Sequence, residues 1–256
     1  MKTYPSDLTE SQWQVIENLI DPNQRKRKYC LRDIMNALLY ITKSGIQWRM
    51  LPNDYAPWES VYYYFRKWKR DGLIEEIHDF LVEKVRIGIG KKPTPSVGII
   101  DSQSVKACNL CKGDVGYDGG KKTKGRKRHI VVDTLGLVMI IVIHAANIHD
   151  SVGAKEVMKS LKDKYLTGIQ KIFADGGYIG ELIEWALLQF GWTMEIVKRN
   201  ETGTFKVLPK RWIVERTFAW LSFHRRMSKD YERLTESGIA FIQLSMIRLM
   251  VNRISI

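Results

Sequence analysis

The sequence is poor in cysteine and has no long apolar run. Its 256 residues contain 3 cysteines, an odd number that does not support a disulfide framework, so we expect a reducing compartment and a cytoplasmic protein. The first residues lack the apolar core of a secretory signal. The most apolar stretch, residues 135–143, is far shorter than the roughly 20 residues that a membrane-spanning helix needs. We therefore expect neither a secreted protein nor a membrane protein.

Acidic residues are also scarce relative to basic ones. The chain has 41 Lys and Arg against 28 Asp and Glu, which gives a formal net charge of +13. Because 45% of the residues are hydrophobic, the composition indicates a folded protein with a core, not a disordered polycation. A basic folded protein favours a polyanionic partner, of which nucleic acid is the commonest.

Residues 87–95 divide the chain, because two glycines and two prolines there would interrupt any helix. We expect one domain over residues 1–92 and another over 93–256. In the first, apolar residues recur at helical spacing over four segments, residues 9–20, 31–44, 58–71 and 73–85. These short helices are typical of a helix-turn-helix module, and equally of a small bundle with a solvated charged face. The candidate DNA contacts of the third helix are Arg66, Lys67, Lys69 and Arg70.

The second part changes to short apolar runs that predict strands, interspersed with helices. The expected strands cover residues 97–100, 129–132, 137–143, 172–174 and 194–197. The expected helices cover residues 151–165, 181–190, 209–226 and 239–254. Strands that alternate with helices around an antiparallel hairpin predict an α/β fold with a mixed sheet flanked by helices.

Three acidic residues occupy positions at which α/β folds commonly place functional side chains. Asp101 and Asp175 each follow an apolar strand, and Glu215 lies among apolar residues of a predicted helix. Carboxylates in this arrangement suit two Mg²⁺ or Mn²⁺ ions that clamp a phosphoryl transfer. Each also has a simpler interpretation: turns at the two aspartates, and an ion pair of Glu215 with Arg211 or Arg216.

In their local sequences these acids resemble a known family. Residues 99–103, 173–178 and 212–221 look like the motifs of the DDE transposases of bacterial insertion sequences, in the insertion-sequence-five family. The similarity covers nearly the whole chain, through residues 8–13, 48–52, 125–134 and 146–150.

The resemblance implies a ribonuclease-H-like catalytic domain preceded by a small helix-turn-helix-like domain that binds the element's terminal inverted repeats. It implies that Asp101, Asp175 and Glu215 are catalytic and hold two Mg²⁺ or Mn²⁺ ions. Such an enzyme would cleave double-stranded DNA at the element's ends and join the 3′-hydroxyls to target DNA, in the bacterial nucleoid. Because two ends must be brought together, we expect a homodimer or a larger assembly on DNA.

The resemblance also identifies departures around the glutamate. Arg211 matches an arginine of the family pattern, but Leu208 replaces the expected tyrosine and Ser222 the expected lysine. The candidates to supply the missing positive charge are Arg225, Arg226 and Lys229.

Basic residues gather in two further segments, which we expect to contact DNA phosphates. The first is glycine-rich and contributes Lys121, Lys122, Lys124, Arg126, Lys127 and Arg128. The second surrounds the glutamate and contributes Arg211, Arg216, Arg225 and Arg226.

Two smaller motifs leave alternatives open. Cys108 and Cys111 form a lone C-x-x-C, which we treat as loop, with zinc binding as the alternative. His149 and Asp150 precede a predicted helix, where Asp150 is expected to cap the helix, or the pair lies behind the metal ligands. For the whole chain, the alternatives to a transposase are a DNA-binding regulator that no longer cuts and a nuclease of the same fold.

Overall fold

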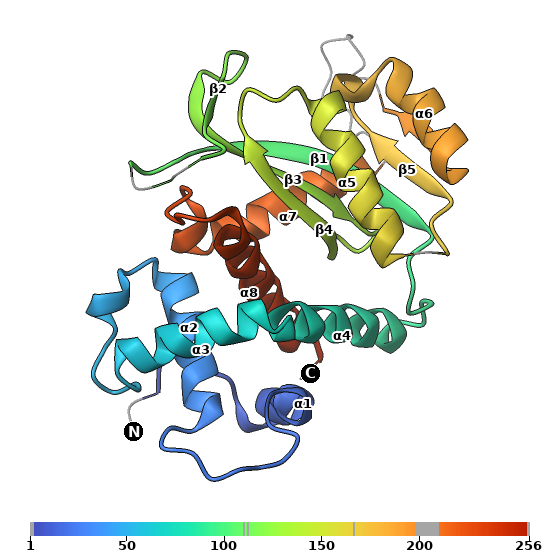
Figure 1. The fold of residues 1–256 in the computed structure, drawn as a ribbon. Coiled ribbons are helices and arrows are strands. Elements are labelled where there is room, and N and C mark those ends of the chain that lie inside the picture. The colour runs from blue at the N-terminus through green and yellow to red at the C-terminus, as the bar shows by residue number, and fades with distance from the viewer. Residues whose placement is uncertain (1–2, 110, 112, 166, 198–209, 255–256) are drawn as a thin grey trace. The chain divides into compact units, whose positions relative to one another are not determined.

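A computed structural model describes residues 3–109, 111, 113–165, 167–197 and 210–254. The chain forms two compact units (Figure 1). The helical unit comprises Met1–Pro93, Leu221–Ser228 and Glu236–Ile256, and the sheet unit comprises Thr94–Trp220 and Lys229–Thr235. The division at Pro93 falls in the expected linker, but the helical unit also takes residues from the end of the chain.

The helical unit begins with α1 (Glu10–Ile20), whose start the sequence specifies. The Thr9 side chain accepts a hydrogen bond from the Gln12 backbone N–H at 3.2 Å, and the Gln12 side chain accepts one from the Thr9 N–H at 3.1 Å. This reciprocal cap satisfies two donors that the helix would otherwise leave unpaired. The next three helices stand where the periodicity predicts them: α2 (Leu31–Ser44), α3 (Trp58–Arg70) and α4 (Leu73–Gly88).

The last helix, α8 (Thr235–Ile254), belongs to the helical unit from Glu236 onward. Phe241 of α8 is fully buried and stacks on Phe65 of α3, with ring centroids 4.9 Å apart. At the other end of α8, Asn252 accepts a hydrogen bond from the Gln12 side chain at 2.9 Å. The four helices before the linker therefore share their core with a helix that the sequence places at the far end of the chain.

The sheet unit is built on six strands. They are β1 (Val97–Lys106), β2 (Gly116–Asp118), β3 (Thr123–Val132), β4 (Val138–Ala145), β5 (Lys171–Ala174) and β6 (Thr193–Ile196). The order is β2-β3-β1-β5-β6, and β4 also pairs with β3. Antiparallel β1, β3 and β4 continue into parallel β5 and β6, which confirms the expected mixed sheet.

Two strands are longer than the apolar runs predict. β1 continues past Asp101 to Lys106, and β3 begins at Thr123. The polar ends of the two strands pair with one another, for example Gln103 with Arg128. Backbone pairing therefore extends β1 and β3 into polar segments that the apolar pattern does not predict to be strands.

Helices cover the sheet on both faces (Figure 1). One face packs on α5 (Asp150–Lys164) and α6 (Glu181–Phe190), in a core that includes Ile100, Val131 and Val157. On the other side, α7 (Arg211–Ser222) is joined to the β3–β4 turn by a hydrogen bond from Thr217 Oγ1 to the Gly136 carbonyl at 2.8 Å. This is the expected ribonuclease-H-like arrangement. Across the residues described, no helix combines the length and apolar character needed to span a bilayer.

Candidate active site

The predicted acids Asp101 and Asp175 lie level with one another at the same place in the sheet. Parallel pairing of β1 with β5 places Ile99 opposite Phe173, and each aspartate follows its partner residue by two positions. Because β5 ends at Ala174, Asp101 stands where β1 loses its parallel neighbour. Asp101 thus lies in the middle of a strand, not at its end as expected, and the end of β5 produces the open edge.

Arg211 links this edge to the third acid, Glu215 on α7. Its Nη2 lies 3.3 Å from Asp175 Oδ2, and its Nε lies 3.2 Å from Glu215 Oε1. The charge of Arg211 also favours the ionised form of Asp101, although burial outweighs this effect and the pKa of Asp101 is raised overall. Arg211 therefore contacts both Asp175 and Glu215, and its charge also reaches Asp101.

The structure realises two of the three simpler interpretations, a turn at Asp175 and an ion pair of Glu215, whereas Asp101 lies within β1 and not in a turn. Asp175 Oδ1 accepts the Gly177 backbone N–H at 2.8 Å, and Asp101 Oδ1 accepts the N–H of Ser102 at 2.7 Å. The ion pair of Glu215 with Arg211 is the intrahelical pair expected at this spacing. These local contacts fix the carboxylates without removing them from the shared edge.

The electrostatics of this edge disfavour the ionised form of Asp101, which is largely buried and close to Asp175. Burial, with a contribution from neighbouring Asp175, raises the pKa of Asp101 to about 6. Such a shift means that the carboxylate ionises at a cost that a nearby cation would remove. In the part of the chain that is described, no three His, Cys, Asp or Glu side chains stand close enough to enclose an ion. The carboxylate oxygens nevertheless fit Mg²⁺ or Mn²⁺ by their chemistry, and Arg211 already balances two of them.

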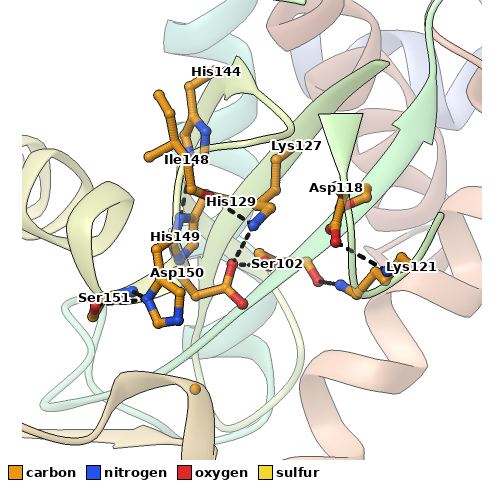
Figure 2. A network of polar contacts seen from close by, with 12 residues as sticks. Ser102, Asp118, Lys121, Lys127, His129, His144, Ile148, His149, Asp150 and Ser151 are labelled. Carbon is orange, nitrogen blue, oxygen red and sulfur yellow. Dashed lines mark hydrogen bonds and ion pairs between the residues drawn. The ribbon is translucent and has the colours of Figure 1, made fainter. Parts of the chain in front are cut away.

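A network of polar contacts lies on the α5 side of this edge (Figure 2). Asp150 Oδ1 accepts hydrogen bonds from Ser102 Oγ at 2.7 Å and from Lys127 Nζ at 2.9 Å. Burial would raise the pKa of Asp150, but these two hydrogen bonds outweigh burial and lower it. The cap of α5 is His149, which accepts the Ser151 N–H, so the expectation that Asp150 caps the helix is wrong. The Asp150 carboxylate faces the sheet because the Lys127 ammonium group there forms an ion pair with it.

Behind this network lies a buried chain of rings. His129 Nε2 lies 2.7 Å from the Tyr178 hydroxyl, and His129 Nδ1 lies 3.3 Å from His144 Nε2. Burial lowers the pKa of His129 to about 3, so the imidazole is neutral at pH 7. Gly153 of α5 packs directly on the two histidines, since a Cβ at that position would lie 2.5 Å from His144 Nε2. These contacts of His129 with His144 and Tyr178 could not be predicted from the sequence, because they join two strands and a turn, with Gly153 of α5 packed against them.

The structure corrects the first predicted set of DNA contacts. Arg126, Lys127 and Arg128 are 0%, 5% and 3% exposed and bond to the protein itself. Arg126 pairs with the equally buried Asp230 at 3.1 Å, and Arg128 donates to the Lys229 carbonyl at 3.1 Å. These three residues cannot contact phosphates in this arrangement. Their positions in β3, covered on both faces, explain the burial.

Other basic residues keep their predicted exposure. Lys121 donates a hydrogen bond to the Ser102 carbonyl at 3.3 Å, and its charge limits the rise in the pKa of Asp101. The exposed members of the predicted sets are Arg66, Arg70, Lys121, Lys122, Lys124 and Arg225. Lys67 and Lys69 are partly covered and contact Asp71 and Ser237 respectively.

Two arginines of the predicted DNA-binding sets, Arg216 of α7 and Arg226, lie over aromatic rings, that of Arg226 being Phe241. The Arg216 guanidinium lies over both Trp212 and Trp220, at 4.4 and 4.5 Å from the ring centroids. Arg226 is 7% exposed and donates to the Ile46 carbonyl, so the prediction that it contacts DNA is wrong. Leu208 lies outside the described residues.

The two cysteines of the C-x-x-C pair face one another, with their sulfurs 3.4 Å apart. Both are free thiols, and Cys111 Sγ also contacts the Asp230 carbonyl. No third ligand of the kind zinc needs joins them among the residues described.

Comparison with known proteins identifies the class of protein that this fold and site define. Residues 92–250 match the family described as Transposase DDE domain, and residues 8–78 match a second, described as Putative transposase of IS4/5 family. Because the first match covers more than half of the chain, the chain belongs to the DDE transposase family.

Particular relatives come from Burkholderia cepacia. The putative transposase for insertion sequence element IS402 is 32% identical over 126 residues, which cover 47% of this chain and 60% of the relative. An IS402 uncharacterized 16.2 kDa protein is 25% identical over 109 residues, 39% of this chain and 73% of its own. The match thus spans 60% of the length of the first relative. A piggyBac transposase synaptic complex with hairpin DNA aligns with 80% of this chain and 45% of its own, at 13% identity and a TM-score of 0.30.

Proposed function

We propose that this protein is an active transposase that cuts the ends of its insertion sequence and joins them to target DNA. The observations that support the proposal are that Asp101 and Asp175 lie level with one another at the open edge of the sheet, and that Arg211 contacts both Asp175 and Glu215. Family membership supplies the reaction class. The alternatives, a silent regulator and a nuclease, are left to the experiment below.

The three carboxylates would hold two Mg²⁺ or Mn²⁺ ions, which would activate the attacking water or DNA 3′-hydroxyl and stabilise the leaving oxygen. The protein's own part is to hold the acids in place. Asp101 is fixed by β1 and Asp175 by the Gly177 N–H, while α7 presents Glu215. Lys121, exposed beside Asp101, would pair with a DNA phosphate as it enters the edge.

DNA is the partner that the charge supports. The helical unit would bind the terminal inverted repeats, with Arg66 and Arg70 of α3 exposed for phosphate contacts. In the sheet unit, Lys122 and Lys124 extend the basic surface that begins at Lys121. Two DNA ends require two active sites, so we propose a homodimer or larger assembly on DNA.

The direct test is cleavage of the DNA that flanks the gene. The full-length protein is incubated with that DNA and Mg²⁺ or Mn²⁺, and 3′ ends and joined products are mapped by sequencing. Asp101→Asn removes one carboxylate charge from the site. Asp163→Asn, on the exposed side of α5, is the matched control.

Cleavage at the repeat boundary by the wild type and by Asp163→Asn, but not by Asp101→Asn, would establish the transposase. Binding without cleavage under either metal would favour the regulator. Cutting without preference for the ends would favour the nuclease. Both of these outcomes contradict the proposal.

A further inference from the structure

Asp150 is not one of the three acids of the site, yet its partly exposed carboxylate bonds to two residues of the sheet (Figure 2). Both of its hydrogen-bond donors, Ser102 Oγ and Lys127 Nζ, meet the same oxygen, Oδ1. His149 performs the capping of α5. The capping hydrogen bond of α5 therefore does not come from Asp150. The helix dipole favours a carboxylate in the first turn, but it does not account for the bonds of Asp150 to the sheet, which have another reason.

The place of Asp150 indicates that reason. Ser102 directly follows Asp101 on β1, and successive side chains of a strand point to opposite faces. A Cβ built on Gly177 would lie 3.1 Å from Asp175 Oδ1 and 3.5 Å from Asp150 Oδ2. Asp150 thus bonds to the neighbour of one catalytic aspartate and borders the turn that carries the other.

The stability of the fold does not explain the ion pair. Lys127 is 5% exposed and also donates to the Ile148 carbonyl at 2.8 Å. The ion pair is partly buried, with 6% of the Lys127 side chain and 26% of the Asp150 side chain exposed, and such a pair adds little stability because the buried charge loses its hydration. Groups that bond to metal-binding residues or their neighbours, in contrast, orient them and change metal affinity.

We propose that Asp150 is a positioning residue of the active site. Held by Lys127, it fixes Ser102 and the first turn of α5, and so sets the separation at which Asp101 and Asp175 bind a divalent ion. This inference rests on the proposed function, because it assigns Asp150 a role in the metal-dependent step.

The test measures metal binding as well as activity, with the full-length protein. Asp150→Asn keeps an acceptor for Ser102 but removes the charge that Lys127 needs. Ser102→Ala removes the hydroxyl donor. Glu156→Gln, on the exposed side of the same helix, is the matched control. Each variant is titrated with Mn²⁺ by electron paramagnetic resonance, assayed for cleavage against Mg²⁺ concentration, and melted without metal.

We expect Mn²⁺ affinity to fall about 10-fold or more in Asp150→Asn, and less in Ser102→Ala. The Mg²⁺ concentration for half-maximal cleavage should rise in parallel. The double variant should bind Mn²⁺ more tightly than the sum of the two losses predicts, because both changes break one contact. Glu156→Gln should match the wild type.

Wild-type Mn²⁺ affinity in a folded Asp150→Asn would overturn the proposal. If that variant melts too low to measure, Lys127→Met with Asp150→Leu replaces the pair by an apolar one. Weakened Mn²⁺ binding in this double variant would support the proposal, and unchanged binding would overturn it. A wild type that binds Mn²⁺ but cuts no DNA contradicts the proposed function alone, because the titrations still decide the role of Asp150. A wild type that binds no Mn²⁺ overturns both.

Discussion

Replacing Arg126 with methionine should destabilise the protein strongly. The guanidinium is fully buried, lies 3.1 Å from Asp230 Oδ2, and donates to the carbonyls of Glu232 at 2.8 Å and Arg233 at 3.1 Å. Without it, the carboxylate of Asp230, itself 2% exposed, would lose the cation it contacts. Breaking a buried ion pair in this way costs about 3–5 kcal/mol. For a chain of this size, 1 kcal/mol shifts the Tm by roughly 2–4 °C, so we expect a fall of roughly 6–20 °C.

The assay is thermal unfolding followed by circular dichroism, with DNA affinity measured on the same samples at a temperature where both proteins are folded. Lys124→Met is the matched control, because Lys124 is exposed on the same strand two residues earlier. Its Tm should stay within about 2 °C of the wild type, as for other surface changes. If Arg126→Met kept its Tm and lost DNA affinity instead, Arg126 would be a phosphate contact and the argument from burial would be refuted.

Three further predictions concern the sheet unit. Because burial lowers the pKa of His129 to about 3, protonation of the unfolded chain below pH 6.5 should reduce stability as the pH falls towards 3, by about 1.4 kcal/mol per unit. In urea unfolding at pH 7.5 and 5.5, His129→Asn should show a smaller loss, and an equal loss would contradict this. Gly153→Ala should lower the Tm, since its Cβ would lie 2.5 Å from His144 Nε2; an unchanged Tm would mean that α5 shifts freely. Lys121→Ala should weaken DNA binding and reduce the slope of log K against log salt by about 1. An unchanged slope in filter binding at several salt concentrations would exclude a phosphate contact there.

Local patterns predict most of the helices and strands, because capping and apolar periodicity act over a few residues. The Thr9 cap, the hairpin of β3 and β4, and the strands that precede Asp101 and Asp175 all follow from short segments. The three acids were also identified from their local sequences. What the structure adds is that Arg211 forms ion pairs with two of them, Asp175 and Glu215.

Contacts between distant residues were not predictable in the same way. A segment rich in Lys and Arg is typical of a solvated loop, so its burial in β3 is not expected. The burial of Arg126 depends on its ion pair with Asp230, more than a hundred residues further along the chain. Likewise, the first turn of a helix gives no sign that Asp150 bonds to Lys127 and Ser102. Only the pairing of β1 with β3 shows that Ser102 and Lys127 share a face of the sheet.

The position of α8 has a consequence for synthesis on the ribosome. The chain passes between its two units at residues 93–94, 220–221, 228–229 and 235–236. During translation the first four helices leave the ribosome long before Phe241, whose ring covers Phe65. A chain cut short before α8 would keep that apolar surface exposed, in the state that chaperones and proteases recognise. The core of the helical unit, most of which is synthesised first, is therefore complete only when α8, the last helix to be synthesised, has been added.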